Sequence, residues 1–212
     1  MSTVMKASAF VPRYNEAQRV THWLVAASFI VATLSGLALF HPAFWFLSSL
    51  VGGGVWSKTL HPWAGLAMVV AFAPMAAWYW KDNLIRPYDV AWIKRLPDVL
   101  NNAGKDLPEI DKYNAGQKML FWSIIGSLVL LLASGLVLWY HPELKLPIGL
   151  VRASGVVHML ASFVLFLGML VHIYSAVFWI RGSMRAMVRG NVGEGWAKHH
   201  HPLWYRRVRG QR

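Results

Sequence analysis

Four histidines lie inside long apolar stretches of the sequence, and their chemistry is the first clue to what the chain binds. They are His22, His61, His158 and His172. Apart from Lys118 at one edge, the stretches contain no Asp, Glu, Lys or Arg. Ionisable groups inside a membrane are costly and are functional candidates by default. Because imidazole nitrogen is a good iron ligand, we expect these histidines to hold haem iron.

The spacing of the histidines sorts them into two pairs. In a helix, the 14 residues between His158 and His172 correspond to about 21 Å along the axis, and the two side chains lie within roughly 40° of one face. If the chain crosses the membrane four times starting from the cytoplasm, His22 pairs with His172 on the inner side and His61 with His158 on the outer side. Two imidazoles fill both axial positions of a haem iron, which favours electron transfer over binding of O₂ or substrate.

The alternative for each histidine is a structural one, in which it caps a helix or hydrogen-bonds a neighbour near the interface. The paired arrangement and the absence of competing charge favour the ligand interpretation. His41 and His141 each precede a proline at a predicted span end, and we interpret them as interfacial stop residues. His199, His200 and His201 lie in a basic tail. A metal-binding tract is one interpretation of them, but a solvated or partner-docking tail is favoured.

The elements that would position these residues are membrane-spanning helices. The chain is 56% apolar and 14% charged, whereas a soluble domain carries about 25% charged residues. About 20 apolar residues cross a bilayer as a helix, and only helices or closed barrels satisfy their backbone there. No stretch alternates as a barrel strand would. We therefore predict one all-α domain over residues 1–212, a four-helix transmembrane bundle with spans near 20–40, 60–80, 117–140 and 155–180.

The net charge of +12 indicates a topology and not a nucleic-acid surface. Eighteen of the 21 Lys and Arg residues fall in the N-terminal arm, the middle loop 81–116 with Lys118 at its edge, and the tail 181–212. The positive-inside rule places these segments, and hence both termini, in the cytoplasm. The absence of cysteine excludes disulfides, iron–sulfur clusters and covalent c-type haem on this chain. The middle loop predicts one short amphipathic helix around Asp89–Asn101.

Two segments of the sequence resemble each other. Thr33-Leu-Ser35-Gly36 near the end of the first span matches Leu132-Ala-Ser134-Gly135 in the third, and each is followed by a loop and a helix that opens with His61 or His158. Two helical hairpins related by a pseudo-twofold axis along the membrane normal would explain the repeat. Chance similarity between apolar stretches is the alternative. The glycines permit close helix approach or leave room for a flat ligand.

Several segments of the sequence together resemble a known family. The residues that carry the match are Arg19-Val-Thr-His22-Trp23, Leu60-His61-Pro62, Tyr113-Asn114-Ala-Gly116-Gln117-Lys118, His158, Val171-His172-Ile173-Tyr174 and Trp196-Ala-Lys198-His199-His200-His201-Pro202-Leu-Trp204-Tyr205-Arg206. They resemble the cytochrome b (gamma) subunit of respiratory membrane-bound formate dehydrogenases, within the wider family of bacterial dihaem b-type cytochromes. The match covers nearly the whole chain, but the histidines alone would fit hydrogenase b-type cytochromes equally well.

The resemblance implies two haem b groups, the inner held by His22 and His172 and the outer by His61 and His158. It also implies a menaquinone or ubiquinone site near the inner haem, because Asn114, Gly116 and Gln117 match the family's quinone-site segment, with His172 close by. From the residues alone, the alternative is that Asn114 caps a helix with Gln117 in its first turn.

The function expected from the resemblance is electron transfer across the bacterial inner membrane. Electrons from formate oxidation would arrive from an iron–sulfur (beta) subunit and reduce quinone near the cytoplasmic side. A molybdenum- or tungsten-containing catalytic (alpha) subunit would oxidise formate, since this chain shows no candidate active site for it. A cytochrome subunit of a NiFe-hydrogenase or related dehydrogenase is the close alternative. A non-redox haem or metal carrier is an alternative of another class, but transport usually needs a polar pathway.

Overall fold

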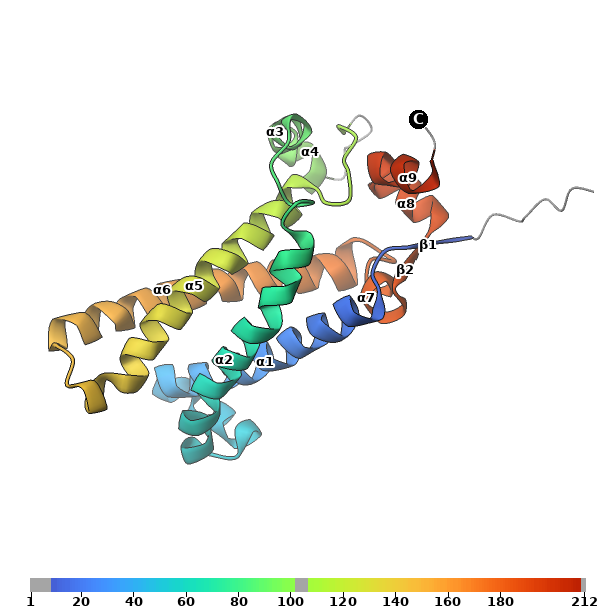
Figure 1. The fold of residues 1–212 in the computed structure, drawn as a ribbon. Coiled ribbons are helices and arrows are strands. Elements are labelled where there is room, and N and C mark those ends of the chain that lie inside the picture. Colours follow the sequence, from blue (N-terminus) through green and yellow to red (C-terminus); the bar gives the residue numbers. More distant parts are fainter. Residues whose placement is uncertain (1–8, 102–106, 211–212) are drawn as a thin grey trace, which may run out of the picture. The chain divides into compact units, whose positions relative to one another are not determined.

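The structure is a computed structural model, and it describes residues 9–101 and 107–210 (Figure 1). Residues 1–8, 102–106 and 211–212, which carry part of the positive charge behind the predicted topology, lie outside the described residues. The chain forms two compact units, which we name and describe separately. The span unit comprises residues 20–78 and 122–171, and the polar unit comprises the described parts of 1–19, 79–121 and 172–212.

Four long helices confirm the predicted all-α membrane architecture. They are α1 (Glu16–Phe40), α2 (Gly54–Tyr79), α5 (Ala115–Leu144) and α6 (Ile148–Tyr174), which continues into a π-helical turn, Ser175–Trp179 (Figure 1). By length and composition, all four can cross a membrane. Large apolar side chains such as Val129 and Phe163 are exposed on them. This is expected of helices whose surroundings are lipid.

Two of these helices begin earlier than the sequence predicted. α2 starts at Gly54 and α6 at Ile148, so His61 and His158 lie inside their helices and do not open them. The prediction was wrong because it stopped each span at the nearest charge, Lys58 or Arg152. A helix tolerates such residues at its end, where the long side chain extends toward water.

α5 also runs past its predicted end. We expected His141 and Pro142 to stop the span, yet the helix continues to Leu144. Pro142 has no N–H to donate to the carbonyl of Leu138. The ring Nδ1 of His141 lies 2.9 Å from that carbonyl and takes the place of the missing donor. Between α1 and α2 the sequence also missed a 3₁₀ helix, η1 (Pro42–Val51), whose N-cap is His41.

The polar unit contains short elements. They are α3 (Pro87–Lys94), α4 (Leu96–Leu100), α7 (Arg185–Arg189), α8 (Glu194–His200), α9 (Pro202–Arg209) and strands β1 (Phe10–Pro12) and β2 (Asn191–Gly193). The single loop helix predicted around Asp89–Asn101 is two helices, because Pro97 lacks the N–H that would continue α3 through Arg95.

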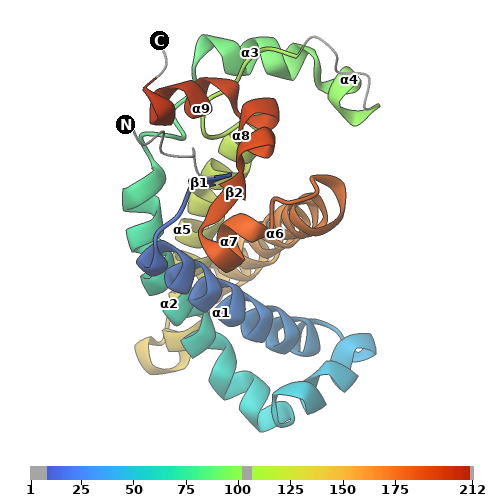
Figure 2. The ribbon, with the colours of Figure 1, turned by 90° about the vertical axis from the view of Figure 1, so that its right-hand side faces the viewer.

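An antiparallel strand pair, which the sequence did not predict, joins the N-terminal arm to the tail (Figure 2). Val11 pairs with Val192, and both side chains are buried in a small core with Ala197 and Trp204. After the strand pair, the N-terminal arm packs against Gly190, whose φ is +75°. A Cβ on Gly190 would lie 2.6 Å from the carbonyl oxygen of Tyr14. Only glycine fits this position without strain.

Candidate functional site

The predicted outer histidine pair comes together in the span unit. His61 of α2 and His158 of α6 are half-buried, and their ring centroids lie 6.1 Å apart. With a metal–nitrogen bond of about 2 Å on each side and about 1 Å from nitrogen to ring centre, two imidazoles bound to one metal have centroids about 6 Å apart. The observed separation therefore fits one iron between the two rings.

A serine of the preceding helix orients each ring. Nδ1 of His61 lies 3.1 Å from Ser35 Oγ and 3.1 Å from the carbonyl oxygen of Ala32. Because a carbonyl only accepts, Nδ1 must carry the proton of the neutral ring. The lone pair is then on Nε2, the nitrogen available to a metal.

The same arrangement recurs at the second histidine. Ser134 Oγ lies 3.0 Å from Nδ1 of His158 and donates to the carbonyl of Leu130 at 2.6 Å. Ser35 donates in the same way to Val31, also at 2.6 Å. The sequence analysis did not assign these serines a role. The signal that could have found them is the Ser-Gly dipeptide shared by the two repeated segments.

The glycines of those dipeptides make room for the imidazoles. A Cβ on Gly36 would lie 2.9 Å from Cε1 of His61, and one on Gly135 would lie 3.2 Å from Cε1 of His158. Both distances are shorter than ordinary van der Waals contact. A Cβ at Gly36 would force the His61 ring to shift, and one at Gly135 would press on the His158 ring.

Both histidines line a cavity of about 660 Å³ in the span unit, formed by α1, α2, α5 and α6. Its walls are mostly apolar, with residues such as Phe29, Leu131 and Phe166. Lys58 is the only Lys, Arg, Asp or Glu among the described residues that line it. A large apolar cavity lined by two neighbouring histidines suits a flat, mostly apolar cofactor with a metal at its centre, which is the chemistry of haem.

The two histidines of the predicted inner pair belong to different units of the structure. His22 lies in α1 within the span unit, where its ring makes an edge contact with Trp23 at a centroid distance of 5.3 Å. His172 lies near the end of α6, within the polar unit. Their pairing stays a prediction.

The segment matched to the quinone site forms the start of α5. The backbone N–H of Asn114 donates to Gln117 Oε1, and the N–H of Gln117 donates to Asn114 Oδ1, both at 2.9 Å. Asn114 caps the helix, as the residues alone had suggested, and the bond from Asn114 to Gln117 makes the capping reciprocal. The two amide nitrogens take no part in these bonds, and Gly116 is exposed. Capping is therefore compatible with hydrogen bonding to a ligand carbonyl.

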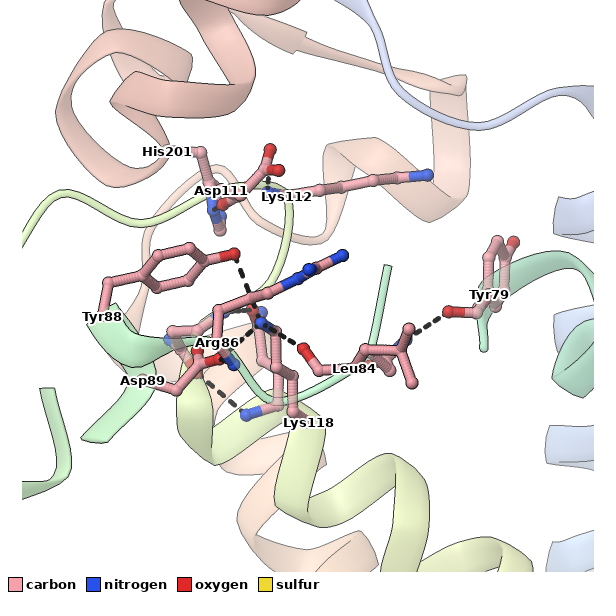
Figure 3. A network of polar contacts seen from close by, with 12 residues as sticks. Tyr79, Leu84, Arg86, Tyr88, Asp89, Asp111, Lys112, Lys118 and His201 are labelled. Atoms are coloured by element: carbon pink, nitrogen blue, oxygen red, sulfur yellow. Dashed lines mark hydrogen bonds and ion pairs between the residues drawn. The ribbon is translucent and has the colours of Figure 1, made fainter. Parts of the chain in front are cut away.

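A buried ion pair lies next to this segment and was missed by the sequence analysis, which placed Lys118 at the edge of a span. Lys118 Nζ lies 2.7 Å from Asp89 Oδ2, and the two side chains are 1% and 0% exposed (Figure 3). The spacing of Asp89 from Lys118 in the sequence gave no sign that they meet.

The histidine tract of the tail is partly buried. His201 is 3% exposed, and its Nδ1 lies 2.8 Å from the carbonyl oxygen of Asp111. Burial, and then the nearby Arg13 guanidinium, lower the pKa of His201 to about 3. The expectation of a solvated tail is therefore wrong for His201, which docks against the loop before α5.

The chain is similar to known proteins over nearly its whole length. Residues 13–190 match the prokaryotic cytochrome b561 family. The chain is similar to the formate dehydrogenase cytochrome b556(fdo) subunit of Escherichia coli K12, with 38% identity over 97% of this chain and 96% of that subunit. It is 36% identical to the formate dehydrogenase cytochrome b556 subunit of Haemophilus influenzae, over 92% and 82% of the two chains. With the nitrate-inducible formate dehydrogenase cytochrome b556(Fdn) subunit of Escherichia coli K12 it shares 35% identity over 96% and 94%.

Proposed function

The chain belongs to the prokaryotic cytochrome b561 family, and we propose that it is the dihaem b-type cytochrome subunit of a membrane-bound formate dehydrogenase. In this role it passes electrons from formate oxidation, received from an iron–sulfur subunit, to a quinone near the cytoplasmic side. The observation that carries the proposal is the His61–His158 pair, which faces a large apolar cavity with both Nδ1 atoms held by protein oxygens.

The chain's own residues define what the outer site does. A haem bound there would supply one-electron oxidation and reduction. His61 and His158 would hold its iron through Nε2, and with both histidines bound no ligand position would be left for O₂ or a substrate. Ser35 and Ser134 fix the ring orientation, and such partners tune the affinity and basicity of a ligating imidazole. The apolar walls keep water away from the site.

The inner site is proposed on sequence grounds. His22 and His172 are the remaining histidines of the spans, and the 14-residue spacing in α6 puts His172 about 21 Å along the helix axis from His158. A second haem b held by this pair would bring the electron toward the opposite side of the membrane. The spans carry no Asp or Glu that would form a proton channel, which agrees with charge separation by electron movement.

We place the quinone, menaquinone or ubiquinone, at the start of α5. The amide nitrogens of Asn114 and Gln117 can donate to a quinone carbonyl, and Gly116 exposes backbone beside them. His172 belongs to the same polar unit. Asn114→Ala is expected to abolish quinone reduction while haem reduction by formate stays intact; normal quinone turnover in that variant would remove this site.

The partners and the membrane orientation follow from the relatives and from the charge distribution. The similar proteins are named as formate dehydrogenase subunits, so we propose an iron–sulfur (beta) subunit and a molybdenum- or tungsten-containing (alpha) subunit as partners. The basic segments place both termini on the cytoplasmic side of the bacterial inner membrane. Pairing of β1 with β2 supports this, because it requires the arm and the tail to lie on one side.

Haem content tests the proposal directly. Purified membranes with the wild-type chain should show b-type bands in a reduced-minus-oxidised spectrum and two haems per chain. His158→Ala should lose the outer haem and retain the inner one, whereas His141→Ala, outside the cavity, should lose neither. Unchanged haem content in His158→Ala would overturn the assignment, and the subunits that co-purify would distinguish formate dehydrogenase from a hydrogenase.

A further inference from the structure

The Lys118–Asp89 pair is fully enclosed by protein groups. Besides Asp89, Lys118 Nζ donates to the carbonyl of Leu84 at 3.0 Å and lies 3.4 Å from Tyr88 Oη (Figure 3). The ammonium also lies over the Tyr88 ring, 4.7 Å from its centroid. All three ammonium donors therefore have acceptors, and the charge is held in one geometry.

A gain in folding stability does not explain the Lys118–Asp89 ion pair. Lys118 lies in the first turn of α5, where the helix dipole disfavours a cation. Burying two ions costs several kcal/mol each, and apolar residues of similar volume are often as stable or more stable. Asp89 Oδ1 is buried and has no hydrogen-bond partner within the described part of the chain. A pair buried at this cost points to a role other than packing.

The pair fixes α3 against the residues of the proposed quinone site. Asp89 Oδ2 accepts from the backbone N–H of Arg86 at 2.7 Å, so the same carboxylate caps α3 and binds α5. Trp92, one turn further along α3, is buried against Ile110 and Ala115. A Cβ on Gly116 would lie 3.5 Å from Trp92 Cη2 and 3.4 Å from Asn114 Oδ1. The indole of Trp92 is thus a wall beside Gly116 and Asn114.

We propose that Asp89 and Lys118 are positioning residues for quinone binding, which clamp α3 across the first turn of α5 and so fix the Trp92 wall beside the Asn114–Gln117 segment. The inference rests on the proposed function, because it assumes that a quinone ring binds at this segment. The pair acts by holding geometry, and it does not deliver protons: the donors of Lys118 are already committed to Asp89, Leu84 and Tyr88.

The test is quinone-reduction kinetics of the whole complex with charge-removing variants. Asp89→Asn and Lys118→Met should each raise the KM for a water-soluble quinone by roughly tenfold, because a small displacement of a binding wall has large effects. The kcat and the haem reduction by formate should stay close to wild type. Lys198→Met, the same change in an exposed ion pair of the tail, should leave KM unchanged.

A double variant distinguishes positioning from proton transfer. Asp89→Leu with Lys118→Met replaces the two ions with apolar groups of similar size and should bring KM back toward wild type. If kcat instead collapses in the double variant at unchanged KM, the pair transfers protons and our proposal is wrong. Haem count and spectrum report whether each variant has folded, and Lys118→Gln, which removes the charge but keeps a polar group, replaces Lys118→Met if that chain fails to fold.

The outcome also separates this inference from the proposed function. If Asn114→Ala abolishes quinone reduction while both single variants keep a wild-type KM, the quinone site stands and the positioning role fails. If Asn114→Ala reduces quinone normally, the proposed site itself is wrong.

Discussion

The span unit and the polar unit use polar side chains for opposite purposes. In the span unit, Ser35 and Ser134 satisfy themselves within their own helices and also hold the ring nitrogens of His61 and His158. In the polar unit, polar groups join segments that are distant in the sequence. All seven ion pairs among the described residues lie there. In the span unit these two serines therefore serve the histidine pair, whereas the polar unit uses its charged groups for assembly.

Arg13 is the centre of that assembly. It donates to the carbonyl of Lys112 at 2.6 Å, lies over the Trp204 ring at 4.8 Å, and is 3.4 Å from His201. The buried guanidinium of Arg13 therefore joins the N-terminal arm to the loop before α5 and to the tail. We expect the two units to respond differently to substitution, and four experiments examine this difference, from the largest effect to the smallest.

Enlarging Gly36 should have the largest effect and should act on the span unit alone. In Gly36→Val the Cβ falls within 2.9 Å of His61 Cε1, so the ring must move and the outer haem should be lost. The haem count per chain and the reduced spectrum measure this loss. Gly126→Val is the matched control, because a Cβ there meets nothing within 4 Å. Retention of both haems in Gly36→Val would contradict the cavity assignment.

Removing Arg13 should act on the polar unit alone. Arg13→Met loses a cation–π contact and a buried hydrogen bond, together worth about 3 kcal/mol of local stability. Proteolysis of the tail should become faster while the haem spectrum stays unchanged. Arg189→Met, another basic residue of the tail, is the comparison. Loss of the outer haem in Arg13→Met, whose proposed ligands His61 and His158 lie in the span unit, would show that the two units are energetically coupled.

Acid should loosen the docked tail through His201. Free imidazole has a pKa of 6.5, whereas burial lowers that of docked His201 to about 3. The undocked tail therefore binds the extra proton as pH falls below 6.5, and docking weakens by at most about 1.4 kcal/mol per pH unit until about pH 3. Docking is fully retained above this window. Hydrogen exchange of α9 at pH 7 and pH 5 measures the effect. His201→Gln, which keeps a donor for Asp111, should reduce the dependence, and the remainder is expected from His200, whose pKa burial lowers to about 4.

Ser35→Ala should have the smallest effect and sharpens the role of the serines. His61 keeps the carbonyl of Ala32 as a partner for Nδ1, so the haem should stay bound. Its midpoint potential should shift, because partners of a ligating imidazole tune the metal. Potentiometric titration of the outer haem checks this. A potential identical to wild type would restrict Ser35 to helix packing.

The sequence predicted those features that depend on local pattern and depth. Uncharged stretches long enough to cross a bilayer predicted the four helices, and the direction of each crossing predicted that His61 meets His158. The serine contacts could have been predicted as well, because the Ser-Gly dipeptide is repeated in the sequence. The Asn114–Gln117 capping was predicted as an alternative to ligand binding; the structure shows the capping, and the ligand remains a proposal.

What the sequence did not predict depends on contacts between distant segments. The two strands that contain Val11 and Val192 have three residues each. Strands this short show no periodic pattern in the sequence. Lys118 and Asp89 lie on different helices, and an isolated charge in a basic loop gives no sign of its partner. His201 belongs to a polar tract that reads as solvated until Arg13 and Asp111 are placed around it.

The pairing of β1 with β2 can form only late in the synthesis of the chain. Phe10–Pro12 leaves the ribosome first, yet its partner, Asn191–Gly193, is translated only after the fourth span. The arm must therefore wait through the insertion of every helix before it is covered. A polypeptide cut short before residue 191 lacks the partner strand of Phe10–Pro12.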